Sequence, residues 1–179
     1  QSISVGDRSS FAIKNDGRLY SWGYNFNGQL GYGDFVSRSS PVQVGTDNDK
    51  FLKVSCSDLR HAVSIKTDGS LWTWGYNFDG QLGHGDRTDK QSPVQVGTDT
   101  DWIDISTMAK GTFAIKKDGS LWSWGNNYSG QLGLGDRTDR SSPVQVGVST
   151  EWVLCSGQQN NALAIKKDGT LWSWGYGNG

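Results

Sequence analysis

The 179-residue sequence has few residues of the kinds that build metal sites, disulfide frameworks or membrane spans. It contains two cysteines, Cys56 and Cys155, and two histidines, His61 and His84. The cysteines form no Cys-x-x-Cys pair, so we expect no zinc site and predict two free, buried thiols that act as small apolar side chains. No apolar run approaches the roughly 18 residues of a membrane span, and no secretion signal is recognisable, so we expect no membrane partner.

The sequence also lacks an excess of charge of either sign. Seventeen basic and eighteen acidic residues give a formal net charge of -1, so the positive field that attracts nucleic acid is missing and nucleic-acid binding is disfavoured. The stretch TDNDK (Thr46 to Lys50) resembles part of a calcium loop. It lacks the glycine and the distal glutamate of the twelve-residue ligand set, so no metal and no other cofactor is predicted.

What the sequence does have is a repeat. Trp22, Trp74, Trp124 and Trp174 follow one another at spacings of 52, 50 and 50 residues, and each lies in a stretch of the type SWGYNFNGQLGYGD. The last of these stretches stops after SWGYGNG. A fixed period near fifty residues is typical of a propeller, in which each unit buries its faces against its neighbours.

Each unit reads as short strands separated by turn residues. In the third unit the strands are predicted at residues 102–106, 112–117, 120–125 and 142–146. The Asp118-Gly119 step predicts a two-residue type I′ hairpin between the second and third strands. Naming the strands A to D, each unit is a four-stranded antiparallel blade. We therefore predict an all-β propeller in a single domain, residues 1–179, with approximate blades 1–47, 48–99 and 100–149 and an incomplete blade 150–179.

The tryptophans are predicted to hold the blades together. Trp122 and Trp124 are two residues apart on strand C, so they point to the same face of the sheet. A large ring that recurs in every unit suits an interface that recurs between units. The predicted packing residues are Trp22, Trp72, Trp74, Trp122, Trp124, Trp172 and Trp174. A sugar-binding role for these rings would instead require them on loops.

The combination of I-K-x-D-G-x-L-[WY]-[ST]-W-G-x-N-x-x-G-Q-L-G-x-G-D with a following P-V-Q-V resembles the repeat of the RCC1 family, named after the regulator of chromosome condensation. The resemblance covers the whole chain and implies a seven-bladed propeller, of which about 3.5 to 4 blades are present. We expect that the residues belong to a longer parent, that a second copy closes the ring, or that an unusual four-bladed ring forms. The chain begins at Gln1 rather than at methionine, which also suggests processing or a fragment.

The segments joining strands A and B differ most between units, and we expect them on the same rim as the links between strands C and D. Loops held on a rigid scaffold often carry binding residues. The candidate partner-binding residues are Asp7, Arg8, Asp58, Arg60, His61, Lys110, Gln158, Gln159 and Asn160. The alternative is relaxed variation on solvated loops. Histidine at the position of His61 is common in the family's repeat, which favours a structural role, and no catalytic triad is apparent around it.

The predicted function is a non-enzymatic scaffold that binds another protein, or a second copy of itself, through this rim. The founding member of the family is a nucleotide exchange factor for a small GTPase and binds chromatin, so the resemblance permits an exchange factor. The chain has neither the basic charge of a chromatin binder nor a long inserted hairpin. A glycan-binding propeller and an amplified or engineered repeat that exists for assembly alone are further alternatives.

Overall fold

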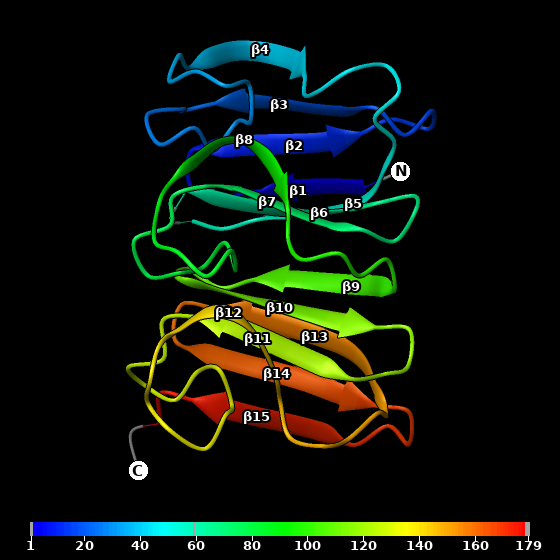
Figure 1. The fold of residues 1–179 in the computed structure, drawn as a ribbon, viewed down its shortest axis with the longest axis vertical. Helices are drawn as coiled ribbons and strands as arrows, with labels where there is room; N and C mark the ends of the chain where they lie inside the picture. Colours follow the sequence, from blue (N-terminus) through cyan, green and yellow to red (C-terminus); the bar gives the residue numbers. More distant parts are fainter. Residues whose placement is uncertain (1, 59, 178–179) are drawn as a thin grey trace.

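The computed structural model describes residues 2–58 and 60–177 and contains fifteen strands in four antiparallel sheets (Figure 1). The strands in chain order are β1 (Ser2–Val5), β2 (Ser9–Ile13), β3 (Leu19–Gly23), β4 (Arg38–Gln43), β5 (Phe51–Cys56), β6 (His61–Lys66), β7 (Leu71–Gly75), β8 (Lys90–Gln95), β9 (Trp102–Thr107), β10 (Gly111–Lys116), β11 (Leu121–Gly125), β12 (Arg140–Gln145), β13 (Trp152–Gln158), β14 (Asn161–Lys166) and β15 (Leu171–Gly175). The described residues include no helix long and apolar enough to cross a membrane. The predicted all-β class is confirmed.

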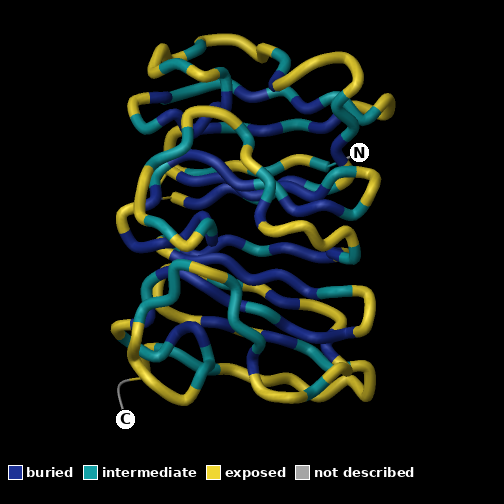
Figure 2. Tube along the Cα trace, in the orientation of Figure 1, coloured by how far each residue is buried: buried dark blue, intermediate teal, exposed yellow. Residues whose placement is uncertain are grey.

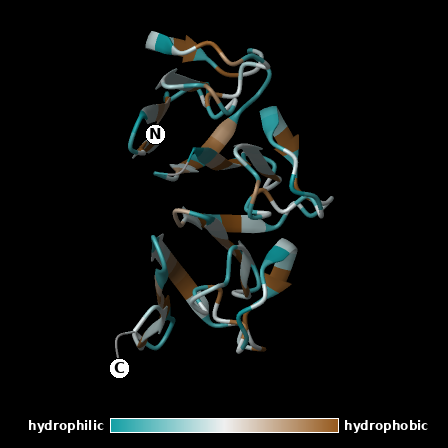
Figure 3. Cartoon of the chain, turned by 90° about the vertical axis from the view of Figure 1, so that its left-hand side faces the viewer, coloured by the Kyte–Doolittle hydropathy of each residue, from teal (hydrophilic) through white to brown (hydrophobic). Residues whose placement is uncertain are grey.

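Each sheet follows the chain from strand to neighbouring strand. The first three sheets have the orders β1-β2-β3-β4, β5-β6-β7-β8 and β9-β10-β11-β12, and the fourth has three strands, β13-β14-β15. These are the predicted blades with strands A to D, and the fourth has its A, B and C strands. Figure 3, which faces one end of the strands, shows the sheets following one another from the N terminus to the C terminus.

The hairpins between strands B and C lie where the Asp-Gly pairs were predicted, but their turn type differs. Lys116 pairs with Ser120 through an N–H···O bond of 3.0 Å, which leaves a three-residue loop. Gly119 has a φ of +85°, whereas Asp118 is not among the residues with positive φ. The two-residue type I′ turn is therefore wrong, because only the glycine takes the left-handed conformation, as in a type I turn followed by a bulge.

The A strands of successive blades lie side by side. Strand β1 contacts β5, β5 contacts β9, and β9 contacts β13. A hydroxyl on each of the first three A strands accepts a hydrogen bond from a backbone N–H of the next blade: Ser4 Oγ from Cys56 N at 3.0 Å, Ser55 Oγ from Thr107 N at 3.1 Å, and Ser106 Oγ from Gly157 N at 3.1 Å. The sheets therefore radiate outward from their A strands, which is the arrangement of a propeller sector.

In the second, third and fourth blades the tryptophans of strand C pack against the preceding blade. Trp124 is fully buried in a cluster with Val63, Leu71 and Ala114, and Trp102 meets it edge to face with 6.5 Å between ring centroids. Trp74 is equally buried against the first blade, and Trp174 packs partly buried against the third. Trp72 and Trp122 are half-buried at the outer side of the same interfaces.

The two ends of the array lack this cover. Trp22 points away from the second blade and is half-buried, while Ile3 and Val5 on the same face are 77% and 72% exposed. At the other end Leu163 is 48% and Leu171 66% exposed. The residues equivalent to these leucines in the third blade are fully buried by the fourth. Figure 2 shows the exposed residues at the C-terminal end of the array, around β15.

Candidate functional site

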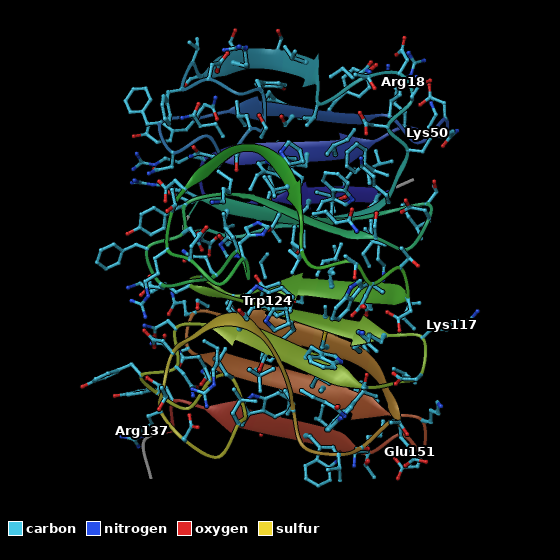
Figure 4. All side chains as sticks on the ribbon, in the orientation of Figure 1. Arg18, Lys50, Lys117, Trp124, Arg137 and Glu151 are labelled. Atoms are coloured by element: carbon cyan, nitrogen blue, oxygen red, sulfur yellow. The ribbon has the colours of Figure 1, made fainter. Side chains whose placement is uncertain are left out.

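The A–B and C–D links meet on one rim. In the second blade, Tyr76 N–H donates to the carbonyl oxygen of Arg60 at 3.0 Å, and the equivalent bond occurs in each of the other blades. Gly75 makes this approach possible, because a Cβ at its position would collide with the same carbonyl, and its φ is +98°. The links therefore form one surface, which we call the loop rim; Arg137 marks it on the left of Figure 4, opposite Lys117 on the other rim.

The Asn, Gln and Asp side chains that recur in each C–D loop form hydrogen bonds within their own loop. Asn77 Nδ2 donates to the backbone oxygen and to Oδ1 of Asp86, at 3.1 and 3.0 Å, while its Oδ1 accepts from Leu82 N at 2.9 Å. Gln81 Oε1 accepts from Asp79 N at 2.9 Å. The same bonds recur in the first and third blades. The Asn, Gln and Asp side chains of the repeat therefore hold the loop in shape.

Eight of the nine candidate residues are exposed on the loop rim, and His61 is the exception. The His61 ring is 1% exposed and lies between the second and third blades. Its Nδ1 is 2.8 Å from Ser57 Oγ, and its Nε2 is 3.2 Å from Thr112 Oγ1. Thr112 already donates its hydroxyl proton to Gln81 O, so the imidazole donates from Nε2 and accepts at Nδ1. Burial lowers the pKa of His61 to about 3, so the ring is neutral and serves as an interblade contact.

Three of the candidates surround one cavity. Asp58, Gln158 and Gln159 line a polar space of about 280 Å³ at the rim end of the A strands, together with Ser57 and Thr107. Gln159 has a φ of +41°, a conformation that non-glycine residues adopt rarely. Three successive blades thus contribute polar groups to one point at the inner edge of the loop rim.

Two of the basic candidates, Arg60 and Lys110, have partners in the preceding blade. Arg60 donates to Asn27 Oδ1 at 3.1 Å, and Lys110 Nζ lies 3.6 Å from the carboxylate of Asp79. Asn27 and Asp79 occupy the same position of successive C–D loops. Arg8 and Arg60 both lie near the ring of Tyr24, at 5.6 and 5.5 Å from its centroid. Asp7 is paired with its neighbour Arg8 at 3.1 Å. The residues that differ between units at the positions of Arg60 and Lys110 therefore contact residues that also differ between units, Asn27 and Asp79.

Sequence reasoning missed a row of aromatic side chains on the loop rim. Phe26 and Phe78 are each 65% exposed, and Tyr128 is 80% exposed. All three occupy the position directly after the structural asparagine of the C–D loop, and Figure 4 shows rings projecting from this side of the molecule. The signal was present in the sequence as an aromatic residue at the same loop position in three units. The neighbouring tryptophans recur in every unit and give the stronger pattern, so the loop aromatics were not singled out.

The two cysteines belong to the framework. Burial raises the pKa of the Cys56 thiol to about 11 and also raises the pKa of Cys155. Both thiols are free and buried, as predicted. Residues 2–58 and 60–177 bring together no group of three or more His, Cys, Asp or Glu side chains suited to a metal ion.

Comparison with known proteins identifies the repeat. A family model described as the regulator of chromosome condensation (RCC1) repeat matches residues 16–62, 68–115 and 118–163. Over 92 residues the chain is 40% identical to the ultraviolet-B receptor UVR8 of Arabidopsis thaliana, an alignment that covers 51% of this chain and 21% of the receptor.

Solved structures show the same fold. Human WBSCR16 superimposes with a TM-score of 0.86 at 24% identity, covering 98% of this chain and 46% of that protein. Yeast RCC1 (Prp20), in a structure with Kap60 bound, superimposes with a TM-score of 0.82 at 20% identity, covering 97% of this chain and 42% of Prp20. The chain therefore spans less than half of each of these relatives.

Proposed function

The chain belongs to the family of RCC1 repeats, and from that membership we propose that it is a non-enzymatic scaffold that binds a protein partner through its loop rim. Propellers of this family support protein–protein interaction in general, as the yeast RCC1 structure with Kap60 illustrates. The identity of the surface and the non-catalytic role are the parts of this proposal that go beyond membership, since a fold by itself does not specify an activity.

The observation that carries the proposal is the row of Phe26, Phe78 and Tyr128 on the loop rim. Aromatic side chains are enriched among the residues that dominate binding energy at protein interfaces. The three rings stand on loops whose backbones are fixed by the Asn77-type hydrogen bonds, so binding costs little loop ordering. The cavity beside Asp58 and Gln158 adds acceptors for a basic or amide group of the partner.

Affinity capture with matched variants tests this proposal. The wild-type chain, the triple variant Phe26→Ala/Phe78→Ala/Tyr128→Ala, and the opposite-rim variant Lys117→Ala/Lys167→Ala are each used to capture proteins from a cell extract, and one captured protein is then titrated in pure form. We expect the opposite-rim variant to bind like the wild type and the triple variant to lose at least tenfold in affinity, with unchanged circular dichroism. Equal affinity for all three would refute a role for the aromatic row.

Guanine nucleotide exchange is the enzyme-like alternative that the family permits. The three complete C–D loops span residues 24–37, 76–89 and 126–139, so they have equal lengths and none carries an insertion. Release of a fluorescent guanine nucleotide from small GTPases measures this activity directly. We expect no acceleration by the chain, and acceleration would replace the scaffold proposal. A glycan-binding role has less support, because the tryptophan rings pack between sheets or at their edges; a glycan array provides its test.

A second candidate is association with another set of blades, which includes a second copy of this chain. It is favoured by the two uncovered end faces, one bearing Ile3 and Val5 beside Trp22 and the other bearing Leu163 and Leu171. At each junction inside the chain, the face that bears the strand C tryptophans of one blade packs on the preceding blade's face that bears the equivalents of Leu163 and Leu171. Exposed apolar faces of this kind mark interaction sites.

Sedimentation over a range of concentrations tests self-association. We expect the average mass of the wild type to rise with concentration, and Leu163→Glu to keep the chain monomeric. Val148→Glu is the matched control, because Val148 is 95% exposed but lies outside both end faces. A monomeric wild type at every concentration, or equal association of Leu163→Glu, would exclude a second copy as the partner of these faces.

A further inference from the structure

The A–B link of the second blade is one residue longer than the links of its neighbours. The links of the first three blades span residues 6–8, 57–60 and 108–110. In the first blade Asp7 and Arg8 are adjacent and form an ion pair of 3.1 Å. In the second blade the equivalent residues, Asp58 and Arg60, are separated by the extra residue. Asp58 therefore lacks the adjacent arginine that neutralises Asp7.

Arg60 contacts the preceding blade instead of Asp58. Its φ is +74°, and its guanidinium donates to Asn27 Oδ1 at 3.1 Å. Lys110, the equivalent residue of the third blade, likewise lies 3.6 Å from the carboxylate of Asp79 in the second. In the part of the chain that the structure describes, no lysine, arginine or histidine forms an ion pair with Asp58, which is exposed.

Asp58 stands at the polar cavity of about 280 Å³ at the inner edge of the loop rim. The other polar side chains of its lining are neutral: Ser57, Thr107, Ser156, Gln158 and Gln159. No lysine or arginine occurs among the described residues that line it. The volume is several times the roughly 30 Å³ that a water molecule occupies in the liquid, so it admits the head group of a side chain. A carboxylate without a cation, set among neutral acceptors, favours a positively charged ligand.

The lining is held in place without a ligand. Ser57, next to Asp58, donates its N–H to His61 O at 3.0 Å, and its Oγ lies 2.8 Å from Nδ1 of the buried His61 ring. The described residues include two non-glycine residues with positive φ, Arg60 and Gln159, and both belong to links that meet at this cavity. Backbone strain of this kind is concentrated at ligand sites, where the surrounding structure maintains it. An ordered lining also lowers the entropic cost of binding.

We propose that this cavity is a pocket for the guanidinium group of an arginine side chain that the protein partner presents, an inference that rests on the proposed role of the loop rim as the binding surface. The guanidinium pairs with the Asp58 carboxylate through two N–H groups and donates further N–H groups to the amide oxygens of Gln158 and Gln159. Cys56 and Met108, which also line the cavity, contact the alkyl part of the arginine. A lysine ammonium cannot form the paired contact with one carboxylate.

Three short peptides test the chemistry of the pocket. Ac-Gly-Arg-Gly-NH2, its lysine analogue and its citrulline analogue, which replaces the guanidinium by a neutral urea of similar shape, are titrated into the intact chain and followed by amide chemical shifts. We expect saturable binding of the arginine peptide, with shifts centred on residues 56–58, 107–109 and 156–159. The citrulline peptide should bind at least tenfold and the lysine peptide at least threefold more weakly. Equal binding by either analogue, or shifts centred elsewhere, would overturn the proposal.

A matched pair of variants tests the role of Asp58. Asp58→Asn keeps the size of the side chain and removes its charge, so we expect at least fivefold weaker binding of the arginine peptide with unchanged circular dichroism. Asp47→Asn is the control, because Asp47 is an exposed aspartate that pairs with Arg18 at 3.3 Å on the opposite rim (Figure 4). It is expected to bind the peptide like the wild type. Equal affinities of the two variants would contradict a pocket built on Asp58.

The partner captured by the wild-type chain separates this inference from the proposed function. We expect Asp58→Asn to weaken binding of that partner at least fivefold. A partner that depends on Phe26, Phe78 and Tyr128 but binds Asp58→Asn like the wild type would leave the scaffold function in place and refute the arginine pocket. Binding of the arginine peptide that depends on Asp58, combined with a partner that ignores the aromatic row, would instead support the pocket and refute the role of that row.

Discussion

The indole Nε1 of Trp124 donates a hydrogen bond to the carbonyl oxygen of Gln81, 2.9 Å away in the preceding blade. Trp74 makes the same bond to Gln29 O, and Trp174 makes it to Gln131 O, each at 2.9 Å. The tryptophan of one blade therefore holds the C–D loop of the blade before it. The two most prominent parts of the repeat, SWG and GQLG, meet across blade junctions instead of within one unit.

Replacing Trp124 tests how much of the stability resides in this junction. Trp124→Ala removes a fully buried ring and one of the two hydrogen bonds to the Gln81 carbonyl, which keeps the bond from Thr112, so we expect a loss of about 3–5 kcal/mol in the free energy of unfolding. Trp22→Ala changes the same strand position at the uncovered end and is expected to cost clearly less. Urea denaturation measures both variants, and equal losses would contradict the junction role of Trp124.

Gly75 is expected to be intolerant of a side chain. At φ +98° it lies under the carbonyl of Arg60, and an added Cβ has no room. Gly75→Ala should therefore lower the free energy of unfolding by well over the ~1 kcal/mol that the left-handed conformation alone costs. Gly97→Ala is the control, because Gly97 has a φ of +62° but open space around its Cβ position. A comparable effect of both substitutions would show that conformation, and not the close approach, determines the cost.

His61 predicts a pH dependence of stability. Its pKa in the folded chain is lowered to about 3 by burial, while the unfolded chain has the ordinary value near 6.5. Below pH 6.5 the unfolded state binds the extra proton, so stability falls as the pH falls, by up to ~1.4 kcal/mol per pH unit until the folded ring also titrates. Denaturation between pH 7 and 4.5 isolates this effect from the aspartates. His61→Asn should reduce the slope, and the remainder is expected from His84, whose pKa is also lowered by burial; an unchanged slope would argue against burial of a neutral ring at position 61.

Lys110 and Asp79 are expected to be energetically coupled across the junction of the second and third blades. Their charged groups are 3.6 Å apart, and the Asp79 side chain is 8% exposed while that of Lys110 is 45% exposed. A double-mutant cycle with Lys110→Gln and Asp79→Asn should give a coupling of about 0.5–1 kcal/mol, modest because the lysine is solvated. A coupling of zero would return Lys110 to the set of residues free to bind a partner.

Features with a strong periodic signal were predictable from the sequence. The fifty-residue period, the alternation along SLWSWG and the Asp-Gly pairs sufficed for the blades, the strand order and the buried face of Trp124. The turn type at Asp118-Gly119 was wrong because a dipeptide does not determine loop length. The register of the flanking strands does, and here it leaves three residues between Lys116 and Ser120.

The candidate site was less accessible to sequence reasoning, since its contacts join residues about fifty positions apart. The environment of His61 depends on Thr112 in the next blade, and that of Arg60 on Asn27 in the preceding one. Neither contact leaves a local pattern. The exposed row of Phe26, Phe78 and Tyr128 did leave one, but exposure depends on loop geometry that only the structure reveals.

The bond between Trp124 and Gln81 also bears on how such a chain can grow. Since every junction uses the same donor and the same acceptor, duplication or deletion of one whole unit recreates a junction of unchanged chemistry. Loss of only the SWG segment or only the GQLG segment of a unit instead leaves a carbonyl or an indole without its partner. Lengthening or shortening by complete copies is therefore the change in length that this architecture tolerates.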